Sequence, residues 1–366
     1  MGAFIDNQAL DSHGYSVRVV AIVQPSAPTP SGGYISGIDG LRAVSALLVV
    51  AFHARVVPGG FVGVDVFFVI SAFLITGILQ REVQHHGAIR LSRFYLRRLA
   101  RLGPALAFML LAYVAFAPLI WPAHPHLSDA LLAAFYVSNY SFALFNSPLY
   151  LQHTWSLSVE EHFYLVWPLL LPFLMRARRP VLWLAAAYLA VICWRMNFGP
   201  DWHSFYYRTD TRAGGLIVGA ALAMALSRLR FASADARIGI AAIAIAAMIG
   251  EFGPASASVF PIAEFGAALV VGAAAQGQLG RLDSVLSAPL LVRLGKLSYG
   301  IYLWHYPITV ALRPHLEGPL LFGAVLVPSV ALAWLSFVTV ERLPALLAAR
   351  TGAPVRPAEP LTGPRP

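Results

Sequence analysis

The sequence is poor in charged residues. Only 12% of its 366 residues are charged, whereas a soluble domain carries about 25%. At the same time 58% are hydrophobic, and a soluble fold of this length could not bury so much apolar surface. We therefore expect most of the chain to face a lipid bilayer.

Cysteine and lysine are nearly absent. The one cysteine, Cys193, excludes an internal disulfide, and its place in an apolar run predicts an inert, buried thiol. The one lysine is Lys296, so arginine carries most of the positive charge behind a formal net charge of +9. The arginines cluster between apolar runs, which is typical of membrane topology, and we expect no nucleic-acid partner. No metal site is expected either.

The two ends of the chain lack both long apolar runs and a recognisable signal peptide. Residues 1–37 include Asp6 and Asp11 and end in the Pro/Gly/Ser-rich stretch QPSAPTPSGG, which predicts a flexible cytoplasmic tail. Residues 343–366 are rich in proline and are interpreted as a second cytoplasmic tail. The transmembrane domain is then 38–342.

Apolar runs that approach the thickness of a bilayer recur along this domain. They cover 41–56, 61–80, 103–121, 129–146, 157–175, 181–196, 213–227, 238–252, 259–275, 297–312 and 319–340. If most basic residues are cytoplasmic, the outer side holds only Arg55, Arg195, Arg208, Arg212 and Arg313. That assignment requires 129–146, which is polar in its middle, not to cross. The predicted fold is therefore all-α, with about ten transmembrane helices plus one re-entrant or interfacial helix, and with both termini cytoplasmic.

Arg42 and His53 flank the first apolar run, GLRAVSALLVVAFHAR (40–55). Eleven residues apart on an α-helix, they share one face and are separated by about 16 Å along the axis. An ionisable side chain inside a span costs about 2.5–3.5 kcal/mol, so His53 requires a compensating role. A cation at the cytoplasmic mouth and a much deeper imidazole suit a long donor held at its phosphates and reacting at its tip. A positive-inside arginine and a histidine satisfied by a neighbouring helix are the alternatives.

Two later motifs carry further ionisable side chains. HTWSLSVEEHFYLVWP (153–168) holds adjacent carboxylates, Glu160 and Glu161, of which at most one readily faces a given cavity. A helix N-terminus also favours acidic residues, which is the structural alternative. LSYGIYLWHYPI (297–308) places Tyr299, Tyr302 and His305 in one polar stripe. An interfacial aromatic belt would explain the tyrosines but not His305.

Two other stretches place polar or charged residues within or next to an apolar run. GFVGVDVFFVISAFLITGIL (60–79) has Asp65 and Ser71 inside a span. FYLRRLARLGP (94–104) has Arg98 and Arg101 three residues apart on the predicted cytoplasmic side. A phosphate-binding role would explain these arginines, and positive-inside bias alone would explain them equally well.

Taken in order, these motifs resemble those of the membrane acyltransferase-3 family, which are bacterial polytopic enzymes. The resemblance rests on the arginine and histidine of the first span, FFVIS.FLI, RRLARLGP, TWSLSVEEHFYL and SYGIYLWHYPI, and it runs from about Ile35 to Pro344. Members of the family O-acylate cell-surface glycans and some secreted small molecules. Each motif alone is weak, whereas five in order along one chain are specific.

The resemblance implies an enzyme of the bacterial inner membrane that moves an acyl group, in the simplest case acetyl from acetyl-CoA, from a cytoplasmic acyl-CoA to an acceptor hydroxyl. It implies catalytic roles for His53 and Glu160 and donor binding by Arg42, Arg98 and Arg101. The supporting positions that it implies are Asp39, Asp65, Ser71, Trp155, Ser156, Tyr164, Arg212, Tyr302 and His305.

Two positions depart from the family's usual pattern. Ala72 follows Ser71 where glycine is usual, which would crowd a close backbone approach. After Arg212 the chain reads AGG where relatives often have an acidic residue, so an ion pair is expected to be missing, and Asp210 is the expected partner of Arg212. Some relatives also carry a periplasmic esterase-like domain after the last span, and this chain is expected to be a form without it.

The chemistry of His53 and the identity of the acceptor stay open at this point. A neutral imidazole can take a proton from an attacking hydroxyl, or it can itself be acylated. The expected acceptor is a cell-surface or lipid-linked glycan, with a secreted small molecule such as a macrolide as the alternative. A transporter or flippase could use the same charges, but we find neither an internal repeat nor matching broken spans.

Overall fold

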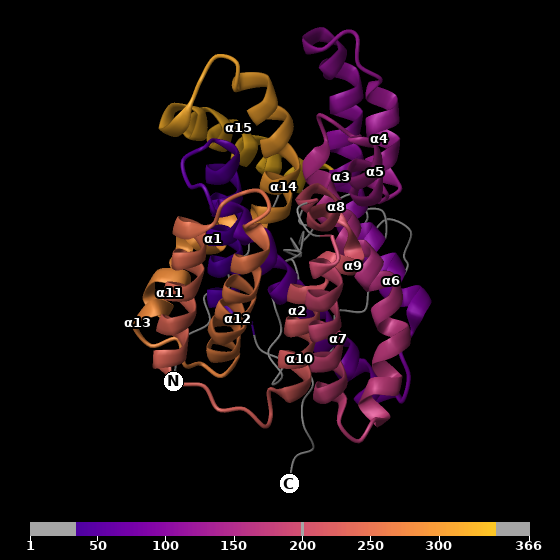
Figure 1. Cartoon of the computed structure of the whole chain (residues 1–366), viewed down its shortest axis with the longest axis vertical. Coiled ribbons are helices and arrows are strands. Elements are labelled where there is room, and N and C mark those ends of the chain that lie inside the picture. Colours follow the sequence, from indigo (N-terminus) through magenta and orange to yellow (C-terminus); the bar gives the residue numbers. More distant parts are fainter. Residues whose placement is uncertain (1–33, 199–200, 342–366) are drawn as a thin grey trace, which may run out of the picture.

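The computed structural model describes residues 34–198 and 201–341, and over these residues it is a bundle of helices (Figure 1). The helices are α1 (Ser36–His53), α2 (Gly63–His86), α3 (Leu91–Ile120), α4 (His126–Ala134), α5 (Ser138–Phe145), α6 (Trp155–Arg176), α7 (Pro180–Met196), α8 (Trp202–Tyr207), α9 (Thr209–Arg212), α10 (Gly214–Ala225), α11 (Ser233–Ile249), α12 (Ser256–Ala275), α13 (Arg281–Leu286), α14 (Pro289–Leu312) and α15 (Gly318–Thr339). Short 3-10 turns, η1 (Gly60–Val62) and η2 (Gln152–Thr154), precede α2 and α6. Most of both predicted tails lies outside the described residues.

Large apolar side chains cover the outside of the bundle. Leu111 on α3, Phe173 on α6 and Val327 on α15 are each at least 70% exposed, which is expected where the surroundings are lipid rather than water. Five helical segments are long and apolar enough to cross a bilayer: Ser36–His53, Gly60–His86, Leu91–Ile120, Ser256–Ala275 and Gly318–Thr339. The all-α membrane fold is therefore confirmed. Cys193 is exposed on α7, so the prediction of a buried thiol is wrong.

The helix boundaries differ most from the predicted runs in three places. α3 begins at Leu91 and α14 at Pro289, because turns that carry basic residues extend each helix before its apolar run begins. The run 129–146, predicted as one helix, contains the break between α4 and α5, where Tyr136 has a positive φ of 54°. With 9 and 8 residues, neither of these two helices is long enough to cross a bilayer.

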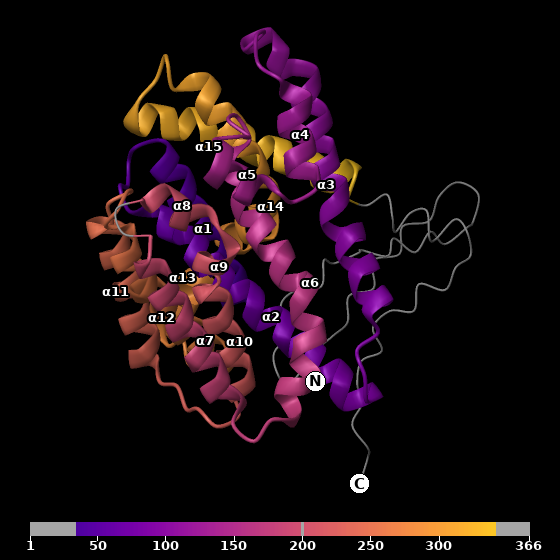
Figure 2. The same cartoon turned by 45° about the vertical axis from the view of Figure 1, so that its right-hand side comes forward.

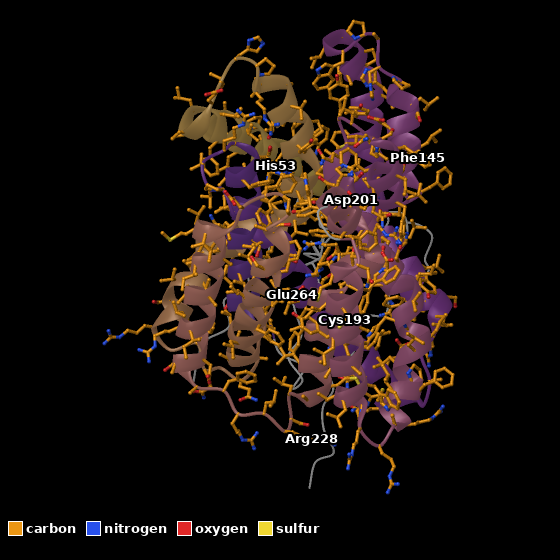
Figure 3. The ribbon with its side chains drawn as sticks, in the orientation of Figure 1. His53, Phe145, Cys193, Asp201, Arg228 and Glu264 are labelled. Carbon is orange, nitrogen blue, oxygen red and sulfur yellow. The ribbon has the colours of Figure 1, made fainter. Side chains whose placement is uncertain are left out.

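The bundle has two chemically different ends. At one end lie the loops that join α6 to α7 and α10 to α11, where Arg228 is found, and we call it the basic end (Figure 3). α1 finishes at His53 toward the other end, which we call the histidine end. Seen from the side, α3 runs along one edge of the bundle, and α4 lies beside its far end (Figure 2).

α1 and α14 run in the same direction and touch backbone to backbone. A Cβ atom on Gly295 of α14 would lie 1.9 Å from the carbonyl oxygen of Asp39 on α1, and one on Gly40 of α1 would lie 1.8 Å from the carbonyl oxygen of Leu286, the last residue of the neighbouring α13. Only glycine permits this approach. The contact fixes the relative height of the two helices that carry the histidines described below.

Replacing Gly295 with alanine is expected to destabilise the fold by about 1–3 kcal/mol, because the new methyl group overlaps backbone that cannot move aside. Thermal unfolding of the purified protein in detergent measures the effect. Gly323→Ala on α15 is the matched control, since a Cβ there meets nothing within 4 Å. Equal thermal unfolding midpoints for Gly295→Ala and Gly323→Ala would contradict the close backbone packing of α1 against α14.

Candidate active site

Two of the predicted site residues, His53 and His305, meet at the histidine end. The Nε2 atom of His305 lies 3.2 Å from Nδ1 of His53, and the ring centroids are 5.1 Å apart. His305 is fully buried on α14, whereas His53 is the last residue of α1 and half-buried. His53 therefore lies at the end of its helix, far along α1 from Arg42.

The surrounding carbonyl groups fix which ring nitrogens carry protons. Nδ1 of His305 is 2.6 Å from the carbonyl oxygen of Tyr302, so this nitrogen must donate, and its Nε2 is left as an acceptor. Nδ1 of His53 faces that acceptor and also the carbonyl oxygen of Val49 at 3.0 Å, so it carries the proton of a neutral ring. The lone pair of His53 is then on Nε2, and His305 holds the ring in this tautomer.

His53 lines a narrow pocket of about 30 Å³. The lining residues are Val49, Phe52, His53, Phe61, Val64, Gln152, His153, Trp155, Tyr206, Tyr207, Phe252 and Tyr302. Most are aromatic, so the pocket offers apolar ring faces with a few polar atoms among them. Of the residues predicted from sequence, Trp155 and Tyr302 join His53 here. Ser156 adjoins them, because its hydroxyl lies 2.5 Å from that of Tyr302.

The carboxylates of α6 lie in a different place. Glu161 forms an ion pair of 2.8 Å with Arg98 of α3, whose guanidinium also stacks 3.2 Å from the ring centre of Tyr164. The Tyr164 hydroxyl forms a hydrogen bond with Ser71 of α2. Glu160 lies beside Ser71 and within electrostatic reach of Arg98. Glu160 is not among the residues that line the pocket of His53, so the structure does not bring the two predicted catalytic residues together.

Two further arginines, Arg42 and Arg101, lie between the Arg98–Glu161 ion pair and the start of α1. Arg42 lies 3.7 Å from the buried carboxylate of Asp39, which also accepts a hydrogen bond from the Tyr34 hydroxyl. Arg101 interacts electrostatically with both Arg42 and Arg98. We call Arg42, Arg98 and Arg101 the arginine cluster. Two of its three arginines are paired, Arg42 with Asp39 and Arg98 with Glu161, and His53 is at the far end of α1 from them.

Charged side chains are also buried in the core between α2, α10 and α12. Nη2 of Arg212 contacts both carboxylate oxygens of Asp65, at 3.0 and 3.2 Å, and both side chains are inaccessible to solvent. The Arg212 guanidinium lies 3.7 Å from the ring centre of Phe260. Asp210 instead pairs with Arg208 at 2.8 Å, so the predicted pairing of Asp210 with Arg212 is wrong.

The acid that was expected to be missing after Arg212 is supplied by another helix. Glu264 of α12 is 1% exposed and accepts a hydrogen bond of 2.6 Å from Tyr188. A Cβ atom on Gly214 would lie 2.5 Å from its Oε1, so glycine at this position leaves room for the carboxylate. Arg195, which donates to the carbonyl of Thr211, lies within electrostatic reach of Glu264. Sequence reasoning missed Glu264 as a partner of this core because it lies more than fifty residues away from both Arg212 and Arg195 along the chain.

His153 is a third histidine that sequence reasoning passed over. It is 2% exposed and lines the pocket with His53, and its ring centroid is 5.5 Å from that of His305. The only signal in the sequence was its place directly before the TWSLSVEEHFYL motif. Among the described residues, no group of three or more His, Cys, Asp or Glu side chains could hold a metal ion.

An imidazole with a free lone pair, held at one end of a helix whose other end lies beside three arginines, is an arrangement suited to group transfer in a helical membrane protein. Residues 35–338 match a family model described as an acyltransferase domain. The chain belongs to this membrane acyltransferase-3 family and is an acyltransferase.

Curated relatives agree with this assignment. The chain is 34% identical over 320 residues to peptidoglycan O-acetyltransferase OatA of Listeria monocytogenes, covering 78% of this chain and 51% of the relative. It is 33% identical to putative peptidoglycan O-acetyltransferase YrhL of Bacillus subtilis (84% and 54%) and to O-acetyltransferase OatA of Staphylococcus aureus (76% and 51%). The chain thus spans about half the length of these relatives. No solved structure matches significantly.

Proposed function

We propose that this protein is an integral membrane O-acetyltransferase that moves an acetyl group from cytoplasmic acetyl-CoA to a hydroxyl of a cell-wall or other cell-envelope glycan. The proposal includes about ten spans in the bacterial inner membrane, with both termini and the basic end cytoplasmic. The relatives are named as O-acetyltransferases, two of them of peptidoglycan, which supports acetyl as the transferred group and a glycan as the acceptor. The arginine cluster supports a phosphate-bearing donor, because guanidinium groups pair with phosphates through charge-assisted hydrogen bonds.

One observation carries the proposal: Nδ1 of His53 is paired with the carbonyl of Val49 and with His305, so the ring that lines the aromatic pocket keeps its lone pair on Nε2. In the proposed reaction, Nε2 of His53 takes the proton of the acceptor hydroxyl as its oxygen attacks the thioester carbonyl. A tetrahedral oxyanion forms and then collapses, and the bond from carbon to sulfur breaks. The proton on His53 passes to the departing thiolate, so the products are the ester and free CoA, and His53 is neutral again.

Acetyl transfer from radiolabelled acetyl-CoA by the purified protein in detergent or liposomes tests this function. We expect label in a soluble peptidoglycan oligosaccharide and an equal amount of free thiol. Label only in a small hydroxylated metabolite would identify the other acceptor class. Absence of both, with a folded protein, would leave the reaction without support, and transport of an intact glycan would then be the function to test.

The arginine cluster is expected to determine the affinity for the donor. Arg42→Ala should raise the KM for acetyl-CoA about tenfold, because one charge-assisted contact to phosphate is lost. Steady-state kinetics at saturating acceptor measure it, with dephospho-CoA thioesters as a second donor. Arg228→Ala, an exposed arginine of the basic end, is the matched control and should leave the KM unchanged. If both variants shift the KM equally, the effect is one of general surface charge.

A further inference from the structure

His153 is held in place through one ring nitrogen only. Its Nε2 lies 3.1 Å from the carbonyl oxygen of Leu303 on α14, so this nitrogen carries the proton and donates. The ring stacks on Tyr306, with centroids 5.1 Å apart and planes 26° apart. The orientation of the imidazole is therefore fixed by α14, although His153 itself belongs to the short turn η2 before α6.

The other ring nitrogen of His153 has no hydrogen-bond partner among the residues that the structure describes. Nδ1 must be an unprotonated acceptor, and it is buried without a hydrogen bond. An unsatisfied buried acceptor costs about 1–3 kcal/mol, so a purely structural histidine at this position would be an inefficient choice. A glutamine could donate to Leu303 through its amide nitrogen and would place no polar atom at the position of Nδ1.

The free nitrogen belongs to a residue that shares the pocket with His53. Both histidines border His305, with ring centroids at 5.1 and 5.5 Å, and both contact Tyr306, at 5.0 and 5.1 Å. Two imidazoles from two different elements thus line the pocket, and each has one unprotonated nitrogen, Nε2 on His53 and the buried Nδ1 on His153. Around them lie the aromatic rings of Trp155, Tyr206 and Phe252.

We propose that Nδ1 of His153 accepts a hydrogen bond from a second hydroxyl or N–H group of the acceptor, next to the hydroxyl that is acylated at His53. The inference rests on the proposed function and narrows its acceptor to molecules that carry two neighbouring polar donors on a flat apolar body. A sugar ring has this chemistry, because adjacent hydroxyl or amide groups project from its rim and its C–H face packs against aromatic rings. His153 is then a residue that binds and orients the acceptor.

Two substitutions separate this role from a structural one. In His153→Gln the amide nitrogen reaches the position of Nε2 and keeps the bond to Leu303, while the acceptor at Nδ1 is lost. In His153→Asn the amide oxygen occupies the position of Nδ1, while the bond to Leu303 is lost. We expect the KM for a soluble peptidoglycan oligosaccharide to rise about tenfold or more in His153→Gln and to change much less in His153→Asn. The KM for acetyl-CoA should be the same in both.

His162→Gln is the matched control, because this histidine lies on α6, which follows the turn of His153, and it bonds to Thr209 outside the pocket. Binding of the oligosaccharide without donor, measured by intrinsic tryptophan fluorescence, reads the same contact whether or not transfer occurs. Weaker binding by His153→Gln than by His153→Asn supports the proposal. The reverse order, or equal binding by both variants and the wild type, overturns it. Absence of transfer in the wild type would refute the proposed function alone.

Discussion

Substituting His53 by glutamine is expected to lower acetyl transfer by about 10²–10⁴-fold, the range that a general base contributes. The amide can still form hydrogen bonds to a neighbouring helix, so the fold around it should persist. It cannot take the proton of the attacking hydroxyl, because an amide is not basic. Initial rates with acetyl-CoA and a glycan acceptor, together with the elution profile of the detergent-solubilised protein, measure activity and folding separately.

His86→Gln is the control for this experiment, since His86 is an exposed histidine at the end of α2. Near-normal transfer by His53→Gln would remove His53 as the base and leave the pocket with a binding role. Glu160 would then be the next candidate, and its place beside Ser71 would move the chemistry toward the arginine cluster.

Removing one partner of the buried Asp65–Arg212 pair is expected to cost about 3–5 kcal/mol of stability, because the other charge is left in the core without compensation. The two arginines and two carboxylates of this core, Asp65, Arg212, Arg195 and Glu264, balance each other. Asp65→Leu therefore leaves one net positive charge in the core. In the double variant Asp65→Leu/Arg212→Met, Arg195 and Glu264 still balance each other, and most of the stability should return. Thermal unfolding in detergent measures both variants.

The surface pair of Arg208 and Asp210 is the matched control. Both side chains are about a quarter to a third exposed, and an exposed pair contributes about 0–1 kcal/mol. Arg208→Ala should therefore shift the unfolding midpoint little. A double variant at Asp65 and Arg212 that is no more stable than the single one would show that the pair is required for more than charge balance.

Hydrophobic periodicity and motif order were enough to predict most of the helices and both histidines of the pair. The apolar runs located the membrane helices because a span must be apolar over most of its length. His53 and His305 stood out because each ionisable group interrupts such a run. Their mutual contact could not be predicted, since it joins residues on two helices whose packing depends on glycines at other positions.

Pairing between helices was the part that sequence reasoning predicted worst. Asp210 was assigned to Arg212 because the two are neighbours in the sequence, whereas Arg212 reaches Asp65 on α2. His153 was overlooked for a related reason. Its free nitrogen becomes apparent only when the carbonyl of Leu303 is seen to occupy the other one. Which polar atoms are left over depends on three-dimensional packing and not on spacing along the chain.

The glycine contact between α1 and α14 has a consequence for the setting in which the enzyme works. Bilayers differ in thickness, and helices respond to a mismatch by tilting. Two helices that touch through their backbones at Gly295 and Asp39 tilt as one body, so the spacing of His53 and His305 is insulated from the tilt of the outer helices. Changes in acyl-chain length of the host lipids should accordingly alter access to the pocket before they alter the basicity of the imidazole within it.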